Sequence, residues 1–158
     1  MTDRPVWQPS ASRAALESRA QLLAHVRGFF SERRVLEVET PVLGRYGVTD
    51  VNLDGIPSAV DAGGVQGGWL QTSPEYHMKR LLAAGSGSIF QIARVFRNGE
   101  RGKRHNPEFS MLEWYRVGFD DQQLMREVSD LVCGWLECSP PVTLSYREAM
   151  QSIAGIDP

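Results

Sequence analysis

The segment that most constrains this chain is residues 88–115, where two apolar stretches flank a cationic loop. Ile89, Phe90, Ile92, Val95 and Phe96 occupy both odd and even positions and predict a strand buried on both faces. Phe109, Met111, Glu113 and Tyr115 alternate and therefore share one face of a second strand. The loop carries Arg97, Arg101, Lys103, Arg104 and His105. The segment thus predicts an antiparallel hairpin suited to an anionic phosphate chain beside a small cationic substrate.

Length and composition bound the chain to one domain or part of one. It has 158 residues, of which 42% are apolar, enough for a sizeable core. A net charge of −2 gives no global attraction to nucleic acid, so anion binding must be local. Apolar runs are far shorter than the ~20 residues that span a bilayer. Cys133 and Cys138 lack neighbours typical of metal ligands. We therefore expect a cytoplasmic protein without membrane contact, whose two cysteines are core or surface thiols in a reducing compartment.

Apolar periodicity places the elements before the hairpin. Leu16, Ala20, Leu23, Val26 and Phe30 form one stripe and predict a helix over residues 12–32. A short strand over residues 35–40 should end at Pro41. Residues 48–70 predict two strands joined by a connection whose glycines, including Gly63, serve turns rather than phosphates. A further helix should be capped by Ser73, carry Pro74 at its first position and end at Gly85.

Two capping-box spacings organise the residues after the hairpin. Asp120 and Gln123 predict the start of a helix that runs to about Leu136. Residues 142–144 predict a short strand, and Ser145 with Glu148 predicts a last helix that ends at Gly155.

Three runs in the hairpin resemble motif two of class II aminoacyl-tRNA synthetases, specifically the lysyl branch. They are Phe96-Arg97-Asn98, Arg104-His105-Asn106-Pro107-Glu108-Phe109 and Met111-Leu112-Glu113. The following Trp114-Tyr115-Arg116 resembles the elongation factor P lysine ligases, synthetase paralogues that modify a protein instead of a tRNA. The helix over 12–32 and the strand ending in Thr40-Pro41 resemble motif one, which builds the homodimer interface in that family. Taken alone, this second pattern also fits an ordinary helix–strand pair.

The resemblance implies a domain that activates an amino acid with ATP. Arg97 would be the catalytic residue, contacting the α-phosphate and the substrate carboxylate, because a guanidinium bridges two oxygen atoms and stays charged. Its structural alternative is a sheet-edge arginine. Arg104 and His105 would reach the distal phosphates, Asn106 would read the adenine edge, and Phe109 would stack on adenine unless it is plain core. Asn98, Gly99 and Glu100 complete the implied ATP-binding residues. Mg²⁺ is expected for the complete domain, with its ligands outside this chain, so no metal ligand is assigned.

The other substrate should be a lysine-type amino acid, whose two ammonium groups are costly to bury without partners. Glu75 and Glu113 supply negative charge, and Tyr115 offers a hydroxyl beside an apolar ring. In the ligase family, which prefers (R)-β-lysine, the segment matching Ser73, Pro74 and Glu75 helps to form the pocket. Residue types alone do not separate α- from β-lysine. Glu75 is also explained by the preference of a helix N-terminus for a carboxylate.

One departure from the family pattern lies directly after the arginine. The usual Asn-Glu is replaced by Asn98-Gly99-Glu100, while the spacing from Arg97 to His105 is unchanged. Either Glu100 takes over the contact of the missing carboxylate, or that contact is lost.

The expected fold is α+β: a class II synthetase-like antiparallel sheet with flanking helices, incomplete at the C-terminus. Residues 1–158 would form the amino-terminal part of the catalytic domain, with motifs one and two, without motif three and without an anticodon-binding domain. The expected function is activation of lysine or (R)-β-lysine and its transfer to a lysine of elongation factor P, with this chain alone inactive. The alternatives are a lysyl-tRNA synthetase fragment that charges tRNA and a non-catalytic binding module.

Overall fold

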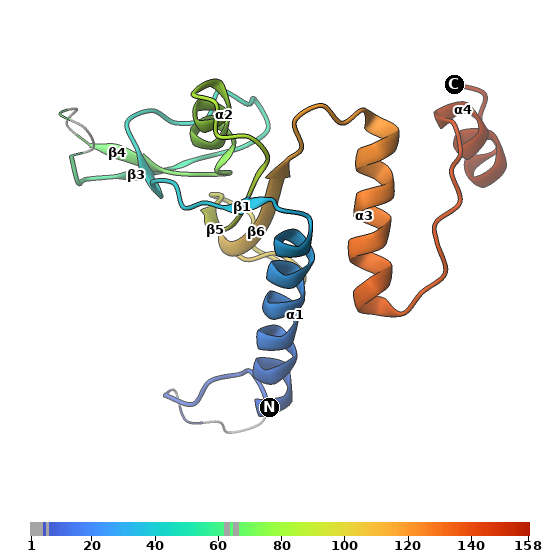
Figure 1. Ribbon diagram of the computed structural model, residues 1–158. Helices are drawn as coiled ribbons and strands as arrows, with labels where there is room; N and C mark the ends of the chain where they lie inside the picture. The colour runs from blue at the N-terminus through green and yellow to red at the C-terminus, as the bar shows by residue number, and fades with distance from the viewer. Residues whose placement is uncertain (1–4, 6, 62–63, 65–66) are drawn as a thin grey trace. The chain divides into compact units, whose positions relative to one another are not determined.

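The computed structural model describes residues 5, 7–61, 64 and 67–158, so the predicted turn at Gly63 lies outside the described residues. The chain divides into two compact units, one up to Gly118 and one from Phe119 onward. The first unit contains, in chain order, α1 (Arg13–Glu32), β1 (Leu36–Glu37), β2 (Leu43–Gly44), β3 (Ile56–Ser58), β4 (Gly68–Leu70), α2 (Glu75–Ala83), β5 (Ile89–Phe96) and β6 (Glu108–Tyr115) (Figure 1).

The strands of the first unit form two three-stranded sheets, in the orders β1-β5-β6 and β2-β4-β3. The α+β class is confirmed. The expected single antiparallel sheet is corrected, because β1 runs parallel to β5 and the β2-β4-β3 sheet is separate. Sequence patterns placed the strands but not β2, which is only two residues long and is defined by its pairing with β4.

Strands β5 and β6 form the predicted hairpin, with Ile89 opposite Tyr115 and Phe96 opposite Glu108. This register puts odd-numbered residues of both strands on one face and even-numbered residues on the other. The hydrogen bond from the Arg97 N–H to the Pro107 carbonyl, 2.9 Å, extends the ladder by one step. Arg97 therefore continues the face that carries Phe109, Glu113 and Tyr115.

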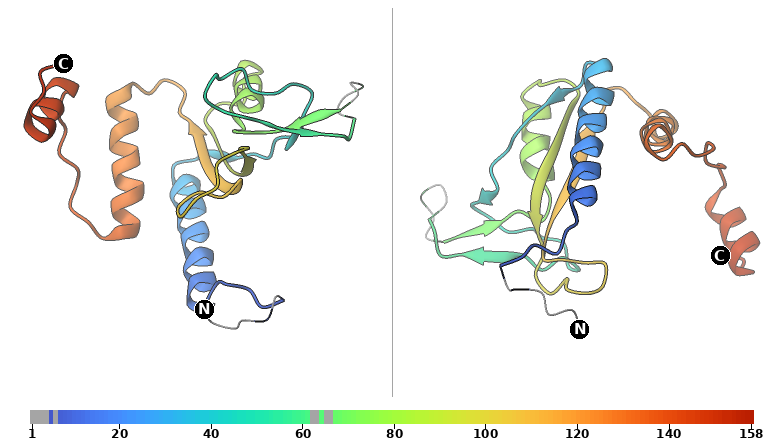
Figure 2. Two further views of the ribbon diagram at one scale, coloured as in Figure 1. Left: turned by 180° about the vertical axis from the view of Figure 1, so that it is seen from behind. Right: turned by 90° about the horizontal axis from the view of Figure 1, so that it is seen from below.

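Helix α1 lies along the even-numbered face of the hairpin (Figure 2). Ser12 caps it as predicted, since its hydroxyl accepts the Ala15 N–H. Phe30 is fully buried, and its ring stacks on Phe90 with centroids 4.5 Å apart and lies 5.4 Å from Trp114. The predicted apolar stripe belongs to the core only in the last two turns of α1, where Val26 and Phe30 are buried. Leu16, at the other end of the helix, is 55% exposed.

Gln71, one residue beyond β4, joins the two sheets. Its N–H donates to Val42 and its carbonyl accepts the Phe96 N–H, both at 2.9 Å. Its side-chain Nε2 donates to the Arg94 carbonyl, also at 2.9 Å. These bonds satisfy the edge of β5 and fix where the following residues, Thr72 and Ser73, cross the hairpin.

Helix α2 follows that crossing. Pro74 occupies the cap position rather than the first helical position, so that prediction was off by one residue. The Ser73 hydroxyl still accepts the Glu75 N–H at 3.0 Å. Gly85 has a φ of +85°, which suits the left-handed turn that commonly ends a helix.

The second unit consists of α3 (Asp121–Leu136), α4 (Tyr146–Ala149) and a five-residue π-helical turn at Met150–Ala154. Both capping boxes are confirmed, and Gly155 ends the last helix with a φ of +67°. The strand predicted over residues 142–144 is absent, because this segment has no strand partner in the described chain. None of the described helices is both long enough and apolar enough to cross a bilayer.

Candidate functional site

The candidate site lies on the odd-numbered face of the hairpin, opposite the face that packs on α1. β6 contributes Phe109, Glu113 and Tyr115, and the end of β5 leads into Arg97. The segment of Thr72 and Ser73 lies across this face and contacts both Arg97 and Glu113. Residues widely separated in the sequence are therefore brought together by the sheet register and by the Gln71 junction.

Glu113 is the centre of a hydrogen-bonded group. Its two carboxylate oxygens accept separate bonds, one from the Ser73 hydroxyl at 2.6 Å and one from the Tyr115 hydroxyl at 2.7 Å. Burial of the phenol, followed by its bond to Glu113, raises the pKa of Tyr115. The phenol is therefore a hydrogen-bond donor that orients the carboxylate. A carboxylate has further lone pairs, so Glu113 has capacity for an additional donor such as an ammonium group.

Arg97 is held on three sides. Its Nε donates to the Thr72 carbonyl at 3.4 Å, and its Nη1 lies 3.8 Å from the Glu100 carboxylate. The guanidinium carbon lies 5.2 Å from the centroid of the Phe109 ring, a cation–π distance. The side chain remains partly exposed, so this arrangement orients the guanidinium and leaves part of it open to solvent.

The turn after Arg97 depends on Gly99. Its φ of +74° lies in the left-handed region, where a residue with a Cβ is strained. This turn brings Glu100 back to Arg97. Asn98 is anchored separately, because its N–H donates to the Asp54 carbonyl at 2.7 Å and its side-chain amide donates to the Asp54 carboxylate at 3.0 Å.

Glu75 lies in the first turn of α2, close to Glu113 in space. Its carboxylate is paired with the Lys79 ammonium one turn later, and this hydrogen bond raises the pKa of Lys79. Both side chains are substantially exposed, so the pair is weak. The Glu75 carboxylate is therefore accessible to a further cation, with Lys79 as its competitor.

A cavity of about 350 Å³ lies beside this group. Thr72, Ser73 and Glu75 line it, whereas Arg97, Glu113 and Tyr115 are not among the described residues that do. Its remaining walls come from α2, from residues 44–53 and from residues 69–71 at the end of β4. The cavity therefore begins at Ser73 and Glu75, which are predicted to bind the amino acid, and extends away from Arg97.

Sequence patterns missed the wall formed by residues 44–53. Thr49 and Tyr76 join this wall to α2 through a 3.0 Å bond between their hydroxyls. The Trp69 ring lies against Gly47 and Gly55, where an added Cβ would come within 3.0 and 3.2 Å of it. These close contacts explain why glycine stands at both positions. They can be recognised only once the position of the Trp69 ring is known.

His77 is a second lining residue that the sequence did not single out. Burial, and then the charge of Arg80, lowers the pKa of its imidazole. The side chain therefore favours its neutral form at the cavity wall.

The remaining predicted residues are not gathered into the hydrogen-bonded group. Arg104, His105 and Asn106 lie in the hairpin loop with exposed side chains. Pro74 is fully buried at the start of α2 and is not among the described residues that line the cavity. Among the described residues, no group of three or more histidine, cysteine, aspartate or glutamate side chains is placed to hold a metal ion.

Comparison with known proteins agrees with the family resemblance of the hairpin and of the helix and strand that precede Pro41. Residues 6–157 match the model of the family "tRNA synthetases class II (D, K and N)". Among curated proteins, the chain is 56% identical over 155 residues to an elongation factor P–(R)-β-lysine ligase of Histophilus somni strain 2336, covering 96% of this chain and 48% of the relative. It is 53% identical over 164 residues to the Pasteurella multocida strain Pm70 ligase, covering all of this chain and 50% of the relative.

The chain spans about half the length of the curated relatives it matches. The family match covers nearly all of the sequence, including α1, both sheets and the Arg97 hairpin. The chain therefore belongs to the class II tRNA synthetase family of the D, K and N type.

Proposed function

We propose that this chain forms part of an ATP-dependent ligase that activates a lysine-type amino acid and transfers it to a lysine side chain of elongation factor P. The observation that carries the proposal is sequence identity of 53–56% along the chain to proteins named elongation factor P–(R)-β-lysine ligase. The reaction belongs in the cytoplasm with the rest of translation.

In the first step the amino-acid carboxylate attacks the α-phosphorus of ATP, forming an aminoacyl adenylate and releasing pyrophosphate. Two anions must approach each other, so a fixed cation lowers the barrier. Arg97 is the proposed cation, and its orientation by Thr72, Glu100 and Phe109 supports this role. The adenine would stack on Phe109, while Arg104 and His105 would meet the distal phosphates and Asn106 the adenine edge.

Two alternatives were left open for Asn98-Gly99-Glu100. The distance between Glu100 and Arg97 supports the one in which Glu100 takes over the contact of the missing carboxylate. The left-handed turn at Gly99 brings the Glu100 carboxylate to within 3.8 Å of the Arg97 guanidinium. We propose that Glu100 supplies the contact of the carboxylate that Gly99 replaces. Asn98 would then act mainly by anchoring the turn to Asp54.

The amino-acid side of the site is proposed to use Ser73, Pro74, Glu75, Glu113 and Tyr115. Glu75 and Glu113 would each meet one ammonium group of the substrate, and Ser73 and Tyr115 would orient the Glu113 carboxylate. In the second step, a lysine amine of elongation factor P attacks the carbonyl carbon of the adenylate, forming an amide and releasing AMP. We further propose that α1 and β1 form a homodimer interface, a role supported by the exposure of Leu16 and Leu36.

A chimera tests the proposal. Residues 6–157 replace the matching segment of the Histophilus somni relative, and the product is offered elongation factor P and lysine tRNA side by side, each with (R)-β-lysine or α-lysine. The proposal predicts ATP-dependent labelling of elongation factor P, fastest with (R)-β-lysine. Labelling of tRNA alone would contradict the proposal and indicate that the protein charges tRNA. Labelling of neither acceptor would favour a non-catalytic binding module. The 158-residue chain alone is expected to show no ATP–pyrophosphate exchange.

A further inference from the structure

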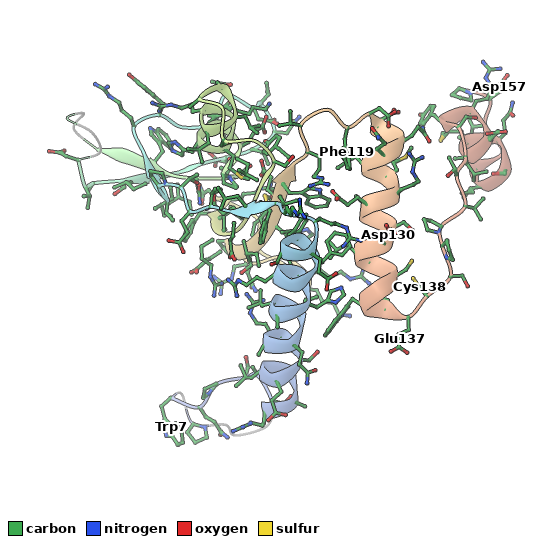
Figure 3. The ribbon with its side chains drawn as sticks, viewed as in Figure 1. Trp7, Phe119, Asp130, Glu137, Cys138 and Asp157 are labelled. Carbon is green, nitrogen blue, oxygen red and sulfur yellow. The ribbon has the colours of Figure 1, made fainter. Side chains whose placement is uncertain are left out.

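The two cysteines of the chain lie together at the end of α3, within the second unit. Helix α3 ends at Leu136, and Glu137 then adopts the left-handed conformation, with φ 51° and ψ 38°. This residue reverses the chain direction, so that Cys138 returns to the last turns of the helix. Figure 3 shows Glu137 and Cys138 at this end of α3. The two sulfur atoms of Cys133 and Cys138 lie 3.0 Å apart.

Both thiols are free, and reagents have access to them. Cys138 is exposed, and Cys133 is half-buried with its Sγ 3.5 Å from the Ser139 carbonyl oxygen. The bond that Cys138 donates to Cys133 raises the pKa of the Cys138 thiol. The two thiols are therefore in direct contact as well as accessible.

We propose that Cys133 and Cys138 are an oxidative modification site that forms a reversible intramolecular disulfide with oxidants of the small-molecule disulfide class. The inference rests on the distance between the sulfurs, their access to solvent and the turn at Glu137, and it does not depend on the proposed ligase function. A pair of thiols is too few to complete a tetrahedral zinc site. It is sufficient for a disulfide, whose formation requires two sulfurs that can approach each other without rearranging the backbone.

Oxidised glutathione is one such oxidant. One cysteine of the pair, as its thiolate, attacks a glutathione sulfur, which forms a mixed disulfide and releases one glutathione thiolate. The neighbouring thiol then loses its proton and attacks the cysteine sulfur of that mixed disulfide, releasing the second glutathione. Two electrons pass from the protein to the oxidant, and the two thiol protons leave with the glutathione molecules.

The test exposes the 158-residue chain to buffers of increasing oxidised-to-reduced glutathione ratio, blocks remaining thiols with iodoacetamide and measures intact mass. The expected product has lost the mass of two hydrogen atoms, takes up no alkyl group and carries no glutathione. Dithiothreitol should restore both alkylation sites. The variants Cys133→Ser and Cys138→Ser should each retain one glutathione on the remaining cysteine, because no neighbouring thiol releases it.

A third variant tests the turn. Glu137→Val places a β-branched residue in a left-handed conformation, and it should raise the glutathione ratio needed for half-oxidation by about tenfold. Glu137→Gly is its control and should leave that ratio near the wild-type value or below it. The proposal is overturned if the unmodified chain keeps glutathione on both cysteines, keeps both thiols alkylatable at every ratio, or forms disulfide-linked dimers instead.

Discussion

On the face of the β5–β6 hairpin that meets α1, Phe90 and Trp114 pack on Phe30, which is excluded from solvent. On the opposite face, Arg97 and Glu113 are held by hydrogen bonds to the Thr72–Ser73 segment and remain partly exposed. The two faces belong to the same two strands and alternate residue by residue. One strand pair therefore carries an aromatic cluster on one face and the proposed site residues on the other.

Apolar burial is the main favourable term in folding, and β5 supplies it on both faces. The Phe30 cluster forms on the α1 side, and Ile89, Ala93 and Val95 are buried on the opposite side, so the polar residues of that side lie beside a core rather than in place of one. A partly buried arginine and glutamate add little net stability, because desolvation offsets their interactions. The hydrogen bonds on the second face are better explained as positioning a guanidinium and a carboxylate than as holding the strands together.

The largest expected difference between the faces is in stability. Phe30→Ala should lower the free energy of unfolding by about 3–5 kcal/mol, because it leaves a cavity at a fully buried position. Phe109→Ala on the other face should cost clearly less, because its ring is only half-buried. Urea unfolding of both variants measures the difference. Equal losses would mean that Phe109 contributes as much to the core as Phe30.

The carboxylates of β6 provide a second comparison. Glu113→Gln should cost about 1–3 kcal/mol, because the bonds from Ser73 and Tyr115 lose a charged acceptor. Glu108→Gln is the matched control, since its exposed ion pair with Arg94 is worth at most about 1 kcal/mol. Chemical denaturation of both variants at neutral pH checks this. A larger loss for the Glu108 variant would contradict the assignment of the faces.

The loop at the hairpin tip permits a sharper test of the turn after Arg97. Gly99→Ala should cost about 1–2 kcal/mol, because a φ of +74° is strained for a residue with a Cβ. Gly102→Ala is its control, since Gly102 lies outside the left-handed region and has equally open space around an added Cβ. Thermal unfolding of the two variants should separate them, and identical melting temperatures would argue against a required left-handed turn.

The smallest expected effect is the pH dependence that His77 contributes at the cavity wall. Its pKa is lowered in the folded chain, so the unfolded chain binds the proton more readily. Stability should therefore fall as the pH drops below about 6.5 and level off below the folded pKa. His77→Gln should flatten this part of the stability curve. A steeper curve for the His77 variant would show that the sign is wrong.

The sequence predicted the hairpin, α1 and both capping boxes because each has a local signal: alternation, helical spacing or a side-chain cap. It also placed Phe109, Glu113 and Tyr115 on one face, since strand periodicity alone determines this. The wall of residues 44–53 was missed, because its position depends on the fit of Trp69 between Gly47 and Gly55. The pairing of Glu100 with Arg97 was left open, because it depends on the backbone conformation of Gly99.

Arg94 and Arg97 lie on opposite faces of the hairpin, and their roles are compared by ATP–pyrophosphate exchange in the chimera. Arg97→Lys should lower the exchange rate by about 100-fold or more, because lysine does not reproduce the forked donors of a guanidinium. Arg94→Lys lies on the α1 face and should leave the rate within about twofold, since its exposed pair with Glu108 is preserved by any cation. Equal rates for the two variants would contradict the account, because they would remove Arg97 from the reaction.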